Sequence, residues 1–252
     1  GLKKYMPITF WTSLIGTLAL VGTPFLSGFY SKDTIIEAAH HAALTGDWVN
    51  NYAYWAVMLG VFVTSFYSFR LLYLTFFGKE RFDTHAEHKE VIAHEIHGNE
   101  SHHDDHTDDH GHHGGLPHES PWVVTVPLIL LAIPSIFIGF FTIGPMLFGS
   151  FFDGAIEVLP QNDVIKAIGE EFHGPVAFAL HGLMQPAFFL ALSGFALATY
   201  IYLYNIKVAE QAQKIFALPI RILENKYGFD DLWIKGFAGG GIATGKKAWK
   251  YI

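Results

Sequence analysis

The sequence predicts an all-α membrane protein with four transmembrane helices, the first of them broken, followed by a C-terminal amphipathic segment. Three observations lead to this fold class. Only 15% of the 252 residues are charged, whereas a soluble domain carries about 25%. Four long stretches contain no Asp, Glu, Lys or Arg, and the charges gather between them. Aromatic residues make up 16% of the chain, which is typical of proteins that pack against lipid and anchor at its interfaces.

Composition also excludes several classes of function. The chain has no cysteine, so it offers no thiolate for an iron–sulfur cluster and no disulfide framework. It has no glycine-rich dinucleotide loop. A net charge of -7 argues against a nucleic-acid partner. We therefore expect no cofactor on this chain and the lipid bilayer as its immediate surroundings.

Charge-free length predicts where the chain crosses the membrane. A spanning helix needs about 20 apolar residues, because lipid cannot satisfy open backbone N–H and C=O groups. Neither end of the chain has the features of a natural terminus, so we expect a fragment of a longer polypeptide. The expected organisation is a broken transmembrane helix at 1–45, a transmembrane helix at 46–78, a His-rich cytoplasmic loop at 79–119, transmembrane helices at 120–152 and 172–206 separated by a periplasmic loop at 153–171, and an interfacial segment at 207–252.

The basic residues predict the orientation. Lys and Arg cluster before the first span, after the second and after the fourth, whereas the loop at 153–171 is mostly acidic. Basic residues near span ends remain on the cytoplasmic side. Both chain ends and the polar insert are therefore expected to face the cytoplasm.

The first span is expected to be interrupted near Pro24. Unbroken helix from Met6 to Leu44 would be roughly 58 Å long, about twice the hydrocarbon thickness. Pro24 removes a backbone donor, and Gly22 and Gly28 loosen the chain around it. Ser31, followed by Asp33, resembles the start of a second helix. Interrupted helices of this kind occur in ion carriers, where they line protein-enclosed cavities.

This interruption makes Lys32 the leading candidate for a proton relay, with Asp33 and Glu37 as secondary candidates. Burying a charged lysine inside the membrane costs free energy, and desolvation disfavours its ammonium form relative to the neutral amine. Asp33 and Glu37 are four residues apart and share a helix face. The alternative interpretation places Lys32 at the end of the first span, where its long side chain reaches the interface.

Several motifs together resemble one family. The opening GLKKYMP, the GFYSKD motif ending at Asp33, TSFYSFR ending at Arg70, HESPW at 118–122 and NKYGFD ending at Asp230 are similar to the C-terminal third of the antiporter-like subunit L of respiratory complex I, whose mitochondrial counterpart is NADH dehydrogenase subunit five. The resemblance implies part of a larger antiporter-like bundle with inverted repeats. It makes Lys32 the lysine at the broken helix of the second repeat, and the final segment the lead-in to a lateral helix, although the glycines at 239–241 should weaken that helix.

The resemblance implies a proton-translocating membrane-arm subunit of NADH:quinone oxidoreductase, coupled to remote quinone reduction. NADH, FMN, iron–sulfur clusters and quinone would be held by other subunits. The expected partners are adjacent antiporter-like subunits, in a bacterial plasma membrane or a mitochondrial inner membrane. Alternatives are a subunit of a multi-subunit cation/proton antiporter, a hydrogenase membrane arm, a metal transporter with a His-rich loop, or a passive scaffold.

The histidines of the chain are not expected to form a dedicated metal site. Eleven of the fifteen His lie between His85 and His118, and the cluster lacks the fixed spacing of a structural metal site. We expect a solvated loop there, with adventitious metal binding at most, at His102, His103, His106 and His110. His173 and His181 are treated as two positions on one helix, with packing as the default role and a proton relay as the alternative.

Overall fold

The structure is a computed structural model that describes residues 1–80, 116–160 and 163–251. The described residues form helices and connecting loops, with no strand among them. They fall into two compact units, residues 1–203 and 204–252. The expected all-helical class is therefore confirmed. The His-rich candidates His102, His103, His106 and His110 lie outside the described residues.

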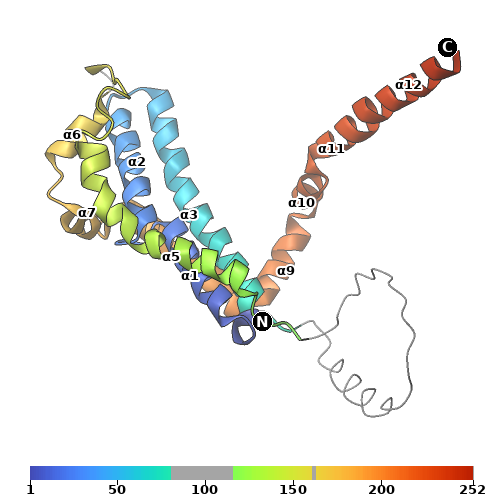
Figure 1. Cartoon of the computed structure of the whole chain (residues 1–252), viewed down its shortest axis with the longest axis horizontal. Coiled ribbons are helices and arrows are strands. Elements are labelled where there is room, and N and C mark those ends of the chain that lie inside the picture. Colours follow the sequence, from blue (N-terminus) through green and yellow to red (C-terminus); the bar gives the residue numbers. More distant parts are fainter. Residues whose placement is uncertain (81–115, 161–162, 252) are drawn as a thin grey trace, which may run out of the picture. The chain divides into compact units, whose positions relative to one another are not determined.

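Unit 1 is a bundle of apolar helices around α3 (Figure 1). α3 packs against α1, α2 and α8, while α5 packs against α1, α2 and α7. Its helical segments are η1 (Leu2–Lys4), α1 (Pro7–Val21), α2 (Ser27–Ala43), α3 (Trp48–Phe76), α5 (Trp122–Ile143), η2 (Gly144–Phe148), α6 (Val164–Glu170), α7 (Pro175–Gly182), α8 (Pro186–Thr199) and η4 (Tyr200–Tyr204).

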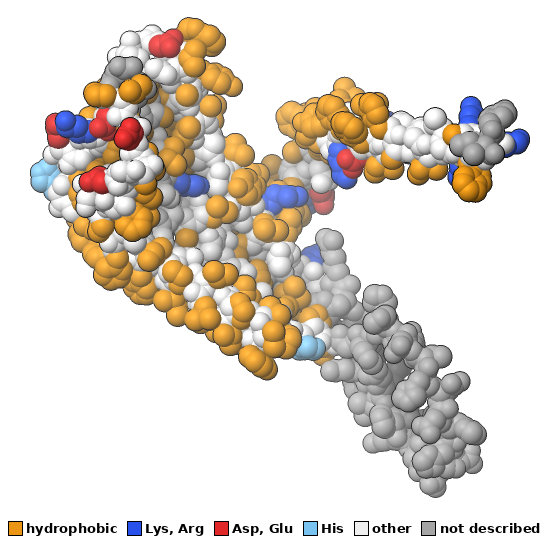
Figure 2. Space-filling view, turned by 45° about the horizontal axis from the view of Figure 1, so that its top comes forward, with side chains coloured by type: hydrophobic (Ala, Val, Ile, Leu, Met, Phe, Trp, Pro, Cys, Tyr) orange, Lys and Arg blue, Asp and Glu red, His pale blue; other side chains and the backbone are white. Residues whose placement is uncertain are grey.

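Three helical stretches are long and apolar enough to span a membrane: Trp48–Phe76, Trp122–Phe148 and Pro186–Tyr204. Pro7–Val21 is a shorter apolar helix. Hydrophobic side chains cover much of the visible face of the bundle, and acidic side chains gather at one end of it (Figure 2). This is a membrane protein, because so large an apolar surface is unfavourable in water.

Two hydrophobic clusters hold unit 1 together. The first joins α1, α3 and α8 through residues such as Phe10, Phe69 and Ala198. The second joins α2, the end of α5 and α7 through Phe29, Ile143 and Phe178. α2 belongs to the second cluster through Phe29 and packs against the first through Ile36, so it contacts both clusters.

Two expectations about helix boundaries are wrong. The second helix of the first span begins at Ser27, not at Ser31, because the chain resumes helix directly after Leu26. The fourth span is itself interrupted, since α7 ends at Gly182 and α8 begins at Pro186. His173 therefore precedes α7, and His173 and His181 do not lie on one continuous helix.

Unit 2 comprises α9 (Ile206–Ile215), α10 (Ala217–Glu224), η5 (Lys226–Gly228), α11 (Phe229–Asp231), η6 (Leu232–Ala238) and α12 (Gly239–Tyr251). Apolar and polar residues alternate in α9 with a helical period, as expected for an interfacial segment. The glycines at 239–241 were expected to weaken the helix at this point. α12 begins at Gly239 and includes all three of them, so the chain is helical at this point, and the expected weakening stays a prediction.

Glu119 caps the N-terminus of α1 from a distant part of the chain. Its carboxylate accepts hydrogen bonds from the Ile8 main-chain N–H at 2.7 Å and from the Thr9 hydroxyl at 2.6 Å. No capping side chain comes from the residue that precedes α1. A carboxylate is favoured there, because the first turn has free N–H groups and a positive dipole. This contact joins the segment before α5 to the start of the first span.

The same contacts set the protonation of Glu119. Removal from water raises the pKa of its carboxyl, but the hydrogen bonds from Thr9, Ile8 and Ser120 outweigh this effect. The pKa is therefore held below its ordinary value. Its stabilising contribution is complete at neutral pH and is lost as the pH falls through the lowered pKa.

We predict that Glu119→Ala lowers the free energy of unfolding at neutral pH by about 1 kcal/mol, the usual effect of losing a helix cap. Thermal denaturation of the purified protein in mild detergent measures this change. The difference from wild type should shrink in acid, where the wild-type carboxyl is also protonated. Glu157→Ala, at an exposed position of the loop before α6, serves as the control. Equal stability of the two variants would contradict the proposed cap.

Candidate functional site

The candidate site is built around the interruption between α1 and α2. Gly22 ends α1 in the left-handed region, with φ of 85°. Its N–H donates to the Ala19 carbonyl, and the N–H of Thr23 donates to the Leu18 carbonyl. These two bonds form the Schellman arrangement that closes many helices. Glycine suits this position because it adopts positive φ without a steric penalty.

Pro24 and Lys32 together determine how the Leu20 carbonyl, near the end of α1, is hydrogen-bonded. In a continuous helix the Leu20 carbonyl would accept from the N–H four residues later, but Pro24 has none. The Lys32 ammonium supplies the missing donor, with its Nζ 2.5 Å from the Leu20 oxygen. A cation is also favoured beside the negative C-terminal end of a helix. Lys32 thus lies in the second turn of α2 and reaches back across the interruption.

The start of α2 is held by close contacts with its neighbours. The Ser27 hydroxyl shares its proton between the carbonyls of Pro134 and Ser135 in α5, at 2.9 Å each. Gly28 packs against α1 so closely that an added Cβ would lie 1.9 Å from the Ala19 oxygen. Only glycine fits at this point. The two half-helices are therefore fixed relative to each other where Lys32 bridges them.

Asp33 is a buried carboxylic acid with an open hydrogen-bonding position. Its side chain is 4% exposed, and its Oδ2 has no hydrogen-bond partner among the described residues. Together with Lys32 it lines a small cavity of about 20 Å³. It also lines a larger cavity of about 490 Å³. Asp33 is therefore common to the space beside Lys32 and to the larger cavity.

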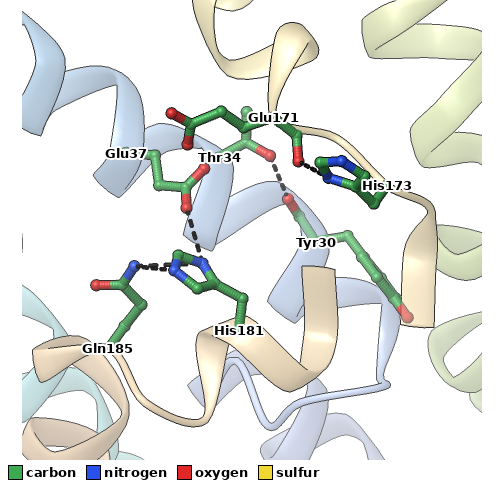
Figure 3. Close-up of polar contacts among 7 residues, drawn as sticks. All are labelled: Tyr30, Thr34, Glu37, Glu171, His173, His181 and Gln185. Carbon is green, nitrogen blue, oxygen red and sulfur yellow. Dashed lines mark hydrogen bonds and ion pairs between the residues drawn. The ribbon is translucent and has the colours of Figure 1, made fainter. Parts of the chain in front are cut away.

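The larger cavity brings Glu37 together with histidines from two segments. Glu37 Oε1 lies 3.7 Å from His181 Nδ1, and the Gln185 amide approaches the same imidazole (Figure 3). His40, His41 and Glu171 line the cavity as well. An adjoining space of about 390 Å³ adds His173, whose ring nitrogen contacts the main-chain oxygen of Glu171. Each of these carboxylate and imidazole groups can take up or release a proton.

The sequence singles out Lys32, Asp33 and Glu37. The structure places Asp33 with Lys32 in the small cavity and with Glu37 in the larger one, and Lys32 and Glu37 share neither cavity. It adds His181, Gln185 and Glu171, which sequence analysis did not place in the site. The sequence indicated His181 only by its position near the start of the fourth span, where packing was the default interpretation. Among the described residues no group of three or more His, Asp or Glu is arranged to hold a metal ion.

Comparison with known proteins identifies the family. A family model described as "NADH:quinone oxidoreductase/Mrp antiporter, TM" matches residues 1–68. NADH-quinone oxidoreductase subunit L of Neisseria meningitidis serogroup B is 44% identical across 99% of this chain, which corresponds to 35% of that relative. The chain is homologous to part of subunit L.

More distant relatives carry the corresponding chain 5 names. NAD(P)H-quinone oxidoreductase chain 5 of Picosynechococcus is 35% identical over 95% of this chain and 32% of its own length. NADH-ubiquinone oxidoreductase chain 5 of Marchantia polymorpha is 31% identical over 92% of this chain and 29% of its own length. The chain therefore spans about a third of the length of these subunit L and chain 5 relatives. The family suggested by the motifs is confirmed.

We predict that the interruption tolerates no side chain at position 28. Gly28→Ala should destabilise the protein by about 1–3 kcal/mol, because its Cβ would overlap the Ala19 carbonyl. Gly16→Ala in α1 has open space around it and should stabilise by about 0.5–1 kcal/mol, since alanine favours helix. Thermal denaturation in detergent measures both effects. A neutral Gly28→Ala would contradict the close packing of α1 and α2.

Proposed function

We propose that this chain carries the outward part of a proton pathway in the membrane arm of NADH:quinone oxidoreductase. Lys32 is the relay, and Asp33 and Glu37 receive the proton from it. The observation that carries the proposal is that these three side chains line two cavities with Asp33 common to both. The homology to subunit L supplies the reaction context.

The geometry supports a stepwise transfer. The protonated Lys32 is held by the Leu20 carbonyl at the end of α1. Transfer of its proton to the Asp33 carboxylate leaves a neutral amine and a neutral acid, and the free Oδ2 of Asp33 faces no competing donor among the described residues. Glu37 then accepts the proton, and His181 beside it passes the proton to water. Each step moves one proton and no electrons.

The direction of transfer follows from the cavity's location. The larger cavity is lined by Ile168 of α6 and by the C-terminal part of α2, beside the loop at 153–171 that is predicted to be periplasmic. α1 begins at the opposite end of the bundle (Figure 1). The proton therefore leaves on the periplasmic side, or in the mitochondrion on the side facing the intermembrane space.

The energy source lies elsewhere in the assembly. NADH, FMN, iron–sulfur clusters and quinone are assigned to other subunits, and adjacent antiporter-like subunits are the direct neighbours. A conformational or electrostatic change that arises at the quinone site would alter the proton affinity of Lys32. The membrane is the bacterial plasma membrane or the mitochondrial inner membrane.

A subunit of a multi-subunit cation/proton antiporter is the second candidate, because the matching family model includes Mrp antiporters. The two candidate functions differ in the other subunits that assemble with this chain. Native mass measurement of the complex after mild detergent extraction distinguishes them. Flavin- and iron–sulfur-containing subunits in the particle would favour the oxidoreductase.

We predict that Lys32→Met abolishes proton translocation by the reconstituted complex while assembly remains intact, because methionine has a similar length and cannot carry a proton. Proton uptake into vesicles driven by NADH oxidation measures the effect, and native gels measure assembly. Lys166→Met, in α6 and outside the two cavities that hold Lys32 and Glu37, is the control. Wild-type uptake in Lys32→Met would end the relay assignment.

We also predict that Glu37→Gln lowers the translocation rate by about tenfold or more, since a positioned proton-transfer group contributes about 10²–10⁴ in rate. His181→Gln should act in the same direction. The number of protons moved per NADH oxidised separates this effect from loss of electron transfer. Glu157→Gln, in the predicted periplasmic loop and outside the larger cavity, is the control. Wild-type translocation rates in both Glu37→Gln and His181→Gln would show that protons leave by another route.

A further inference from the structure

An apolar groove runs along unit 1 on the other side of the interruption from the acidic cavity. Its volume is about 440 Å³. α3 forms its floor through Phe69 and Leu72, while α1 and α8 supply the walls. Two lining residues, Phe77 directly after α3 and Leu192 of α8, remain 42% and 47% exposed. No described residue covers this surface, which lies over the first hydrophobic cluster.

The groove has the length of one lipid leaflet. Along α1 its lining runs from Phe10 to Val21, about 16 Å at the helical rise of about 1.5 Å per residue. Half of a bilayer's hydrocarbon core is about 15 Å. The groove ends at Gly22 and Thr23, where α1 stops. Its length along α1 therefore matches the hydrocarbon depth of one leaflet.

A lysine lies at the end of the groove that is farthest from the interruption. Lys3 Nζ lies 4.8 Å from the ring centres of both Phe10 and Phe77, which line the groove there. Lys3 has no acidic partner among the described residues, whereas the neighbouring Lys4 pairs with Glu80 at 2.9 Å. Basic groups at the cytoplasmic end of a pocket between membrane helices attract anionic lipid headgroups.

We propose that this groove binds one acyl chain of an anionic phospholipid from the cytoplasmic leaflet, with its phosphate beside Lys3. The hydrocarbon chain fills the space between α1 and α8 and reaches Gly22. Val21, Gly22, Phe188 and Ala191 line both this groove and the small cavity beside Lys32. The bound chain therefore also excludes water from the inner side of the interruption.

Lipid binding to the purified complex that contains this chain tests the proposal. Native mass spectrometry would compare retention of 1-palmitoyl-2-oleoyl phosphatidylglycerol with that of the phosphatidylcholine bearing the same chains. We expect the anionic lipid to be favoured about fivefold, the effect of one Lys near the headgroups. Lys3→Gln should remove this preference, whereas Lys166→Gln, in the loop region predicted to face the opposite side, should retain it.

A second pair of variants tests the groove itself. Leu192→Trp places a larger ring in the groove and should displace the tightly held lipid. Leu197→Trp, also on α8 and 41% exposed but absent from the groove lining, should not. Cryo-electron microscopy of the wild-type complex should show a lipid tail between α1 and α8. Equal lipid retention in both Trp variants, no headgroup preference, or a protein helix in the groove would overturn the proposal.

Discussion

The contact between the Lys32 ammonium and the Leu20 carbonyl is the interaction on which the rest of the site depends. Lipid offers no hydrogen-bond donor, so every main-chain carbonyl freed inside a membrane must find one in the protein. Pro24 deprives the Leu20 carbonyl of its usual donor. Lys32 replaces that donor with a charged group, and the cost of burying the charge is offset by the negative end of α1. The interruption and the lysine therefore stabilise each other.

Because Lys32 and the end of α1 stabilise each other, a change in the protonation of Lys32 affects the interruption. If Lys32 gives up its proton, its amine still has N–H groups, but it loses the charge that favours the end of α1. In the proposed relay, the protonation state of Lys32 would therefore be coupled to the packing of α1 against α2. Gly28 and Ser27 hold the two half-helices close enough for this coupling to operate. A looser junction would let water replace the lysine.

The two sides of the interruption differ in polarity. On one side, Asp33 leads to the cavity that contains Glu37 and His181. On the other, the groove between α1 and α8 is lined almost entirely by apolar side chains. A proton on Lys32 therefore has titratable acceptors in one direction and a hydrophobic barrier in the other. Glu119 fixes the far end of α1, so the same helix is anchored at both ends.

The sequence by itself determined the membrane class and the interruption near Pro24, because charge-free length and proline act locally along the chain. It also singled out Lys32, Asp33 and Glu37, whose role in proton transfer is our proposal. It placed the start of α2 four residues too late, since Ser31 has the features of a helix cap while packing of Ser27 against α5 decides the boundary. Only the tertiary structure paired Lys32 with Leu20, Glu37 with His181 and Glu119 with α1. Those partners meet through helix packing, and no local pattern encodes which distant helix face lies opposite.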